Sequence, residues 1–213
     1  MSLNKNFLSL DKFIHQALYS PKTGFYMKKN PFGDKGDYIT SPLISVLFSE
    51  MLSVWTVAFW QNLKCPKNIN LIELGAGNGQ MMYDMINSFK SFPEFNKSCK
   101  FYIFETSPYL KKIQKEKLKE FNVIWIKNLN EIKKNYNIFI ANEFFDALPV
   151  KQFFKIKNKW LERFIKLDKN NNKSFINLDS NIKKIEKKVG FRISKNQKVI
   201  EYSPQTFEYL KNI

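Results

Sequence analysis

The 213-residue chain has few of the side chains that build metal and redox sites. Its two cysteines, Cys65 and Cys99, form neither a metal-binding nor a redox spacing, and they are typical of a protein from a reducing compartment. His15 is the only histidine, so a histidine-rich metal centre is excluded. Because His15 lies in an amphipathic N-terminal segment, we expect a structural role for it, with a catalytic role as the alternative. We expect no bound metal and a cytoplasmic location.

Long apolar runs and a targeting segment are also lacking. No stretch reaches the roughly 18 apolar residues of a membrane-spanning helix, and nothing near the N-terminus has the pattern of a signal peptide. Insertion into a membrane is therefore not expected. The chain is long enough for one domain with a proper core, which its 21 Phe, 9 Tyr and 4 Trp can fill well.

Arginine is scarce although the formal net charge is +16. Arg163 and Arg192 are the only arginines, and the other basic residues are lysines. Proteins that read a nucleic-acid sequence usually rely on the bidentate contacts of arginine. We therefore expect no specific nucleic-acid partner, and only weak, salt-sensitive binding to polyanions.

The most informative feature that is present is the motif Glu73-Leu-Gly75-Ala-Gly77-Asn-Gly79. Apolar residues before it predict a strand, and the apolar spacing after it predicts a helix whose free N–H groups face a ligand. The dinucleotide fingerprint G-x-G-x-x-G would need a glycine at position 80, which is Gln80. The spacing E-x-G-x-G-x-G instead indicates S-adenosylmethionine (SAM). The alternative is a glycine turn that binds nothing.

Three later segments also end in polar residues. The strand expected over 100–104 ends in Glu105, which can accept both hydroxyls of a ribose, although a solvated acid is the alternative. Strands expected over 122–126 and 137–142 are followed by Asn128 and by the run Asn142-Glu143-Phe-Phe-Asp146. Alternating strands and helices predict a parallel sheet covered by helices, with all four strand ends at one edge. The cofactor-binding candidates are Glu73, Gly75, Gly77, Gly79, Glu105 and Asn128.

We expect three regions: an N-terminal helical or lid region over 1–68, a Rossmann-like core over 69–149, and a third region over 150–213. A helix from Ser41 to about Leu63 should be largely buried, and the loop 36–40 is either a lid or a connector. The third region should insert a β-hairpin, 150–157 with 160–167, and begin another helix at Ser203. No strand is evident for the far side of the first strand, so the sheet is expected to be incomplete.

Several motifs together resemble the MidA-like family of SAM-dependent methyltransferases, which have the Rossmann-like class I fold. The similarity runs from about residue 7 to the end of the chain. It depends on segments 19–26, 36–42, 73–79, 105–114 and 141–149, of which the last, Ala-Asn-Glu-Phe-Phe-Asp-Ala-Leu-Pro, is highly specific. Family members run well past 300 residues and continue into a strand ending in Asp-Tyr-Gly. Ala76 also stands where proline is usual.

The resemblance implies SAM as the cofactor and a protein substrate with an acceptor arginine. Mitochondrial members dimethylate an arginine of a respiratory complex I subunit and support its assembly. For such an acceptor, Glu143 and Asp146 would grip the guanidinium, and Asn142 would hold the acceptor or the cofactor. One helical turn would bring Glu143 and Asp146 to the same side. The alternative makes Asn142 a helix cap and Asp146 a partner of the helix dipole.

Three hypotheses follow from these observations. The chain is an active SAM-dependent protein methyltransferase, a catalytically inactive SAM-fold module that binds a partner, or an incomplete fragment whose missing half another chain supplies. In the last case we expect oligomerisation or a partner chain that completes the sheet.

Overall fold

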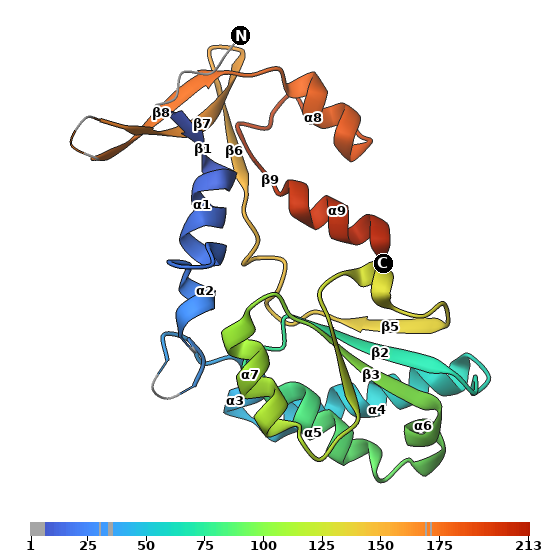
Figure 1. Ribbon diagram of the computed structural model, residues 1–213. Coiled ribbons are helices and arrows are strands. Elements are labelled where there is room, and N and C mark those ends of the chain that lie inside the picture. Colours follow the sequence, from blue (N-terminus) through green and yellow to red (C-terminus); the bar gives the residue numbers. More distant parts are fainter. Residues whose placement is uncertain (1–6, 30, 34–35, 169, 171) are drawn as a thin grey trace. The chain divides into compact units, whose positions relative to one another are not determined.

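The computed structural model describes residues 7–29, 31–33, 36–168, 170 and 172–213 (Figure 1). Contacts group the chain into two units, one made of Met1–Leu18 with Ala147–Asn212 and the other of Tyr19–Asp146 with Ile213. None of the helices in the described part of the chain is long and apolar enough to cross a membrane.

The Tyr19–Asp146 unit contains a sheet of four parallel strands in the order β4-β3-β2-β5 (Figure 1). The strands are β2 (Ile69–Leu74), β3 (Cys99–Phe104), β4 (Val123–Ile126) and β5 (Tyr136–Ile140). The expected parallel sheet is thus confirmed. The expectation that no strand lies on the far side of the first strand was wrong, because β5 pairs with β2 on that side. The order of strands along the chain does not show on which side of the first strand a later one pairs.

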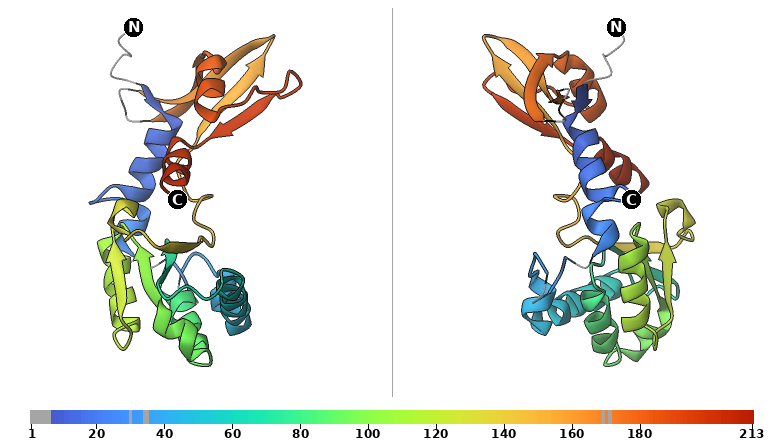
Figure 2. Two further views of the ribbon diagram at one scale, coloured as in Figure 1. Left: turned by 90° about the vertical axis from the view of Figure 1, so that its right-hand side faces the viewer. Right: turned by 60° about the vertical axis from the view of Figure 1, so that its left-hand side comes forward.

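Helices cover one face of this sheet. Figures 1 and 2 show α7 (Pro108–Lys117), α5 (Gln80–Phe89) and α4 (Val46–Asn62) side by side on it. The apolar face expected for α5 is at most 4% exposed and packs into the core with β2 and β3; it comprises Met81, Met82, Met85, Ile86 and Phe89. The unit also contains short elements, among them α2 (Phe25–Lys28), α6 (Pro93–Ser98) and the 3-10 turn η1 (Leu129–Glu131).

The helix expected over 41–63 differs from expectation in two ways. It is interrupted at Ser45, whose hydroxyl accepts the N–H of Leu47 and caps α4 after the short α3 (Ser41–Ile44). The inward face of α4 is partly polar, and the hydroxyls of Ser53 and Thr56 donate to backbone carbonyls one turn earlier. Val57 and Trp60 are buried in the core, but five other large apolar side chains of α4 are 40–60% exposed: Leu47, Met51, Val54, Trp55 and Phe59. We call these five residues the α4 outer face.

The second unit is built on an antiparallel sheet. Its strands are β1 (Phe7–Ser9), β6 (Lys151–Ile156), β7 (Lys159–Leu167), β8 (Lys173–Asp179) and β9 (Val199–Tyr202), and its helices are α1 (Leu10–Tyr19), α8 (Ile182–Val189) and α9 (Pro204–Asn212). The expected hairpin is confirmed as β6–β7, with Lys157 and Asn158 at positive φ in the turn. Strand β8 was not predicted, because the polar residues 170–173, which run into its start, indicate a loop.

The division into units differs from the three regions expected from the sequence. Strand β1 pairs with β7, so the start of the chain belongs with the hairpin. Residues 7–9 form this strand where a helix was expected, and residues 1–6 of that segment lie outside the described residues. The rest of the expected lid region, residues 19–68, belongs with the parallel sheet.

Candidate functional site

The glycine motif forms the turn between β2 and α5. Gly77 has φ of 53°, and a Cβ built on it would lie 3.3 Å from a ring carbon of Phe32. Gly75 has φ of 70°, and its Cβ would lie 2.7 Å from the ring of Phe144. Any other residue at these positions would be strained and crowded. The turn is therefore built for close approach of the backbone to its surroundings, as the spacing predicts.

Glu73 sits at the end of β2, beneath this turn. It is 4% exposed, and its Oε2 has no hydrogen-bond partner within the described part of the chain. Burial first, and the charge of Glu105 second, raise the pKa of Glu73 to about 8, against a hydrogen bond from the backbone N–H of Met82. An unsatisfied buried carboxyl group is costly. A cationic ligand beside it would offset that cost, and the sulfonium and ammonium groups of SAM fit this requirement.

Glu105 follows β3 and is also buried. The N–H of Ser107 donates to Oε1 at 2.7 Å, and the side-chain amide of Gln114 donates to Oε2 at 2.9 Å. Burial raises the pKa of Glu105, while these hydrogen bonds oppose the rise. Each carboxylate oxygen has a further lone pair, so the group can still accept two ribose hydroxyls. The structure brings Glu73 and Glu105 close enough for their charges to interact.

Asn128 lies after β4, as expected, but is exposed and caps η1. The Glu131 carboxylate accepts the N–H groups of Asn128 and Lys127 at 2.7 and 2.9 Å. This capping box accounts for Asn128 structurally. Its cofactor role stays a prediction.

The segment after β5 is irregular, so the helical turn expected to align Glu143 with Asp146 was wrong. The alternative roles of Asn142 as a helix cap and Asp146 as a dipole partner fail for the same reason. Glu143 has φ of 48°, which is uncommon outside glycine and costs about 1–3 kcal/mol. Glu143 and Asp146 are exposed, and Asn142 is half-buried. Strain of this kind is concentrated at functional sites.

Tyr26 is a residue that sequence reasoning did not select. Burial raises its pKa, and its neighbour Tyr38 and the charges of Asp146 and Glu143 raise it further. Its hydroxyl therefore lies in the field of both acidic residues. The hydroxyl of Ser107 donates to the Tyr26 carbonyl at 2.6 Å, which ties this N-terminal segment to the loop after β3.

Phe32, which precedes the loop 36–40, contacts the glycine turn. The ring of Phe32 faces Gly77 and stacks on that of Tyr26 at 6.4 Å between centroids. A bridge from Phe32 to Tyr38 and an ion pair of 2.5 Å between Lys29 and Asp37 hold the loop in this shape. Whether the loop 36–40 is a lid or a connector stays a prediction.

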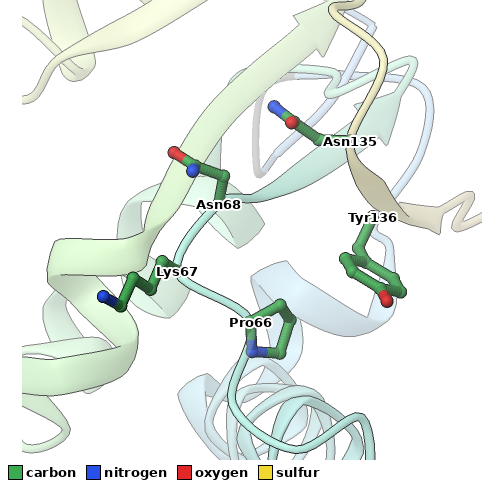
Figure 3. A pocket seen from close by; sticks show the side chains of 5 residues that line it. All are labelled: Pro66, Lys67, Asn68, Asn135 and Tyr136. Carbon is green, nitrogen blue, oxygen red and sulfur yellow. The ribbon is translucent and has the colours of Figure 1, made fainter.

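A surface hollow lies elsewhere. Figure 3 shows its lining residues, Pro66, Lys67, Asn68, Asn135 and Tyr136, which lie at or just before the first residues of β2 and β5. Ligands of open α/β sheets bind at the carboxyl ends of the strands. The hollow is therefore at the wrong end of the sheet, and the glycine turn remains the candidate site. Within the described part of the chain, no cluster of His, Cys, Asp and Glu could hold a metal ion.

The chain is similar in sequence to a known protein family. The family described as "Putative S-adenosyl-L-methionine-dependent methyltransferase" (Methyltransf_28) matches residues 51–213. "Protein arginine methyltransferase NDUFAF7, mitochondrial" of Xenopus laevis is 32% identical over 185 residues, which cover 76% of this chain and 42% of that protein. The Homo sapiens protein of the same name is 31% identical with the same coverage. The chain thus spans less than half the length of these curated relatives.

A solved structure has the same fold. The crystal structure of a COG1565 superfamily protein from Burkholderia thailandensis bound to S-adenosyl-homocysteine aligns with a TM-score of 0.77 and 23% sequence identity. The alignment covers 97% of this chain and 55% of that one. It confirms the expected α/β class with a parallel sheet.

Proposed function

Because the chain belongs to this family of SAM-dependent methyltransferases, we propose that it transfers a methyl group from SAM to an arginine side chain of a protein. The observation that carries the proposal is the glycine turn flanked by two buried carboxyl groups, Glu73 and Glu105. By analogy with the mitochondrial members of the MidA-like family, we place the activity in the assembly of respiratory complex I.

Bound SAM would supply an activated methyl group on its sulfonium. The chain therefore has to bind the cofactor, align it with the acceptor and exclude water. We assign the ribose to Glu105 and the cationic end of the cofactor to Glu73. Gly75, Gly77 and Gly79 give the backbone access, and Asn128 is a further cofactor contact. The aromatic rings of Phe32 and Tyr26 keep water from the turn.

The acceptor side is formed by the strained segment after β5. A guanidinium has a pKa above about 12, so it enters charged, and carboxylates can grip its fork. Glu143 and Asp146 are placed for this, with Asn142 as a positioning group. The names of the Xenopus and human relatives support arginine as the acceptor.

We also propose that a second copy of the chain covers the flank of the sheet at β5. In the described residues β5 pairs only with β2, so its other edge is open. The α4 outer face exposes on the order of 500 Å² of apolar surface, and a standard interface buries roughly 800 Å² per partner. An exposed apolar patch of this size often marks an interaction surface.

Methyl transfer to proteins tests the central part of this proposal. A total protein extract incubated with the chain and isotope-labelled SAM should acquire label on arginine. Glu143→Gln should slow transfer by about 30- to 1000-fold while cofactor affinity changes little, because a preorganised charge is lost. Glu116→Gln, an exposed substitution of the same type on α7, is the matched control. Label on other residue types only, or unchanged transfer by Glu143→Gln, would contradict the assignment.

A further inference from the structure

Gln114 is fully buried in α7 and uses its whole side-chain amide in hydrogen bonds. The nitrogen donates to the carbonyl of Gly77 and to Oε2 of Glu105, both at 2.9 Å. The oxygen accepts the indole N–H of Trp125 on β4 at 3.0 Å. One side chain thus connects the glycine turn, the acid after β3, and the neighbouring strand.

The contact with Trp125 fixes which way the amide faces. An indole N–H can only donate, so the oxygen of Gln114 must lie toward Trp125 and its nitrogen toward Gly77 and Glu105. The two amide protons then meet a carbonyl and a carboxylate, which both accept. Neither an aliphatic side chain nor a carboxylate of the same size could supply these two donors.

Gln114 also connects the two loops of the candidate cofactor site. Gly77 belongs to the turn after β2, and Glu105 belongs to the loop after β3. The Gln114 nitrogen contacts both, while the other oxygen of Glu105 is bonded to Ser107 of its own loop and the Gly75 N–H donates to the Phe104 carbonyl. A Cβ at Gly79 would lie 3.4 Å from Gln114 Cγ, so the side chain also supports the turn from below.

We propose that Gln114 is a positioning residue, which holds the Glu105 carboxylate at a set distance from the glycine turn and so sets recognition of the ribose hydroxyls. The inference rests on the proposed function, since it needs SAM in this site. Gln114 acts through Glu105 and does not itself touch the ribose. Its loss should therefore weaken the hydroxyl contacts more than the rest of the cofactor contacts.

The experiment measures binding of S-adenosyl-homocysteine and of its 2′-deoxy analogue to the 213-residue chain by calorimetry. The wild type should prefer the ribose form by about tenfold or more, as expected for a hydrogen bond to a charged group. In Gln114→Met, which keeps the length of the side chain, this preference should fall to about threefold or less. Gln114→Glu should bind the ribose form more weakly still, because its charge opposes that of Glu105. Trp125→Phe should lose part of the preference, because the amide is then free to turn.

The control is Gln61→Glu, an exposed substitution of the same type on α4, which should leave both affinities unchanged. If Gln114 only fills space, Gln114→Met should bind S-adenosyl-homocysteine and its 2′-deoxy analogue equally more weakly and keep the wild-type preference for the ribose form. That result overturns the proposal. Circular dichroism shows whether Gln114→Met folds. If it does not, the proposal is overturned when Trp125→Phe prefers the ribose form as strongly as the wild type does. Absence of any binding by the wild type refutes the proposed function, and this inference with it.

Discussion

At the scale of single residues, the buried Glu73 makes the protein sensitive to pH. Its pKa of about 8 in the folded state lies above its ordinary value of 4.5, so the folded protein holds an extra proton between these two pH values. The contribution of Glu73 to the free energy of unfolding is complete below pH 4.5 and is lost as the pH rises to 8. The same group should become charged when a cation binds beside it.

Replacing Glu73 with glutamine should remove this dependence. The Glu73→Gln variant should be more stable than wild type at pH 8–9, on the order of a few kcal/mol, and should match it near pH 4. It should also bind SAM more weakly, because the counter-charge is gone. Urea unfolding across pH 4–9 measures the first effect and calorimetry measures the second. Equal pH slopes for the two proteins would show that Glu73 is charged in the apo protein.

Two features at this scale were beyond prediction from sequence. The left-handed backbone of Glu143 is not encoded in its residue type, since only glycine and a few polar residues favour it. The network of Gln114 depends on β4 lying beside β3, which brings Trp125 to the amide. Helical spacing shows only that Gln114 shares a face with Leu110 and Leu118. The places of Glu73 and Glu105 at the ends of β2 and β3 were predictable from the apolar runs before them, and their cofactor roles stay predictions.

At the scale of elements, Ser107 joins a helix to a distant segment. Its hydroxyl accepts the N–H of Leu110 at the start of α7 and donates to the Tyr26 carbonyl. Ser107→Ala should lower the free energy of unfolding by about 2–3 kcal/mol, since it removes a cap of about 1 kcal/mol and leaves a carbonyl unpaired. Ser203→Ala, which removes a similar contact to Thr206 at α9, should cost only about 1 kcal/mol. Equal losses in urea unfolding would show that the Tyr26 contact contributes nothing.

Local signals predicted most elements of the parallel sheet and the turn after its first strand. Apolar runs mark β2, β3 and β5, and the Ser107-Pro108 cap of α7 is confirmed. The orientation of α4 was not predictable, because its serine and threonine hydroxyls are satisfied inside the helix and can be buried. Pairing of β1 with β7, far apart in the chain, likewise left no local signal.

At the scale of the whole molecule, charge and surface apolarity act in opposite directions. A net charge of +16 keeps molecules apart, whereas α3 and α4 together carry a single ionisable residue, Glu50. The α4 outer face is therefore a neutral apolar surface on a strongly cationic chain. Association through this face avoids opposing lysines from the two partners.

Purified chains should thus be larger in solution than the monomer mass of 25.3 kDa. Trp55→Glu should return them to the monomer, because a charge in the middle of an apolar interface is costly. Phe191→Glu, at a side chain that is 62% exposed in the other unit, should change nothing. Size-exclusion chromatography with light scattering measures the masses. A monomeric wild type at about 100 μM would contradict the proposal for this surface.

The most direct test of the account is a calorimetric titration of the 213-residue chain with SAM. We expect one site per chain in the wild type and at least a tenfold loss of affinity in Gly77→Val, whose side chain would fill the space beside the turn. Gly190→Val provides the control, since Gly190 has φ of 82° but no atom within 4 Å of its Cβ position; it should bind SAM like the wild type. No binding by the wild type, or equal affinities for all three proteins, would contradict the assignment of the glycine turn as a SAM site.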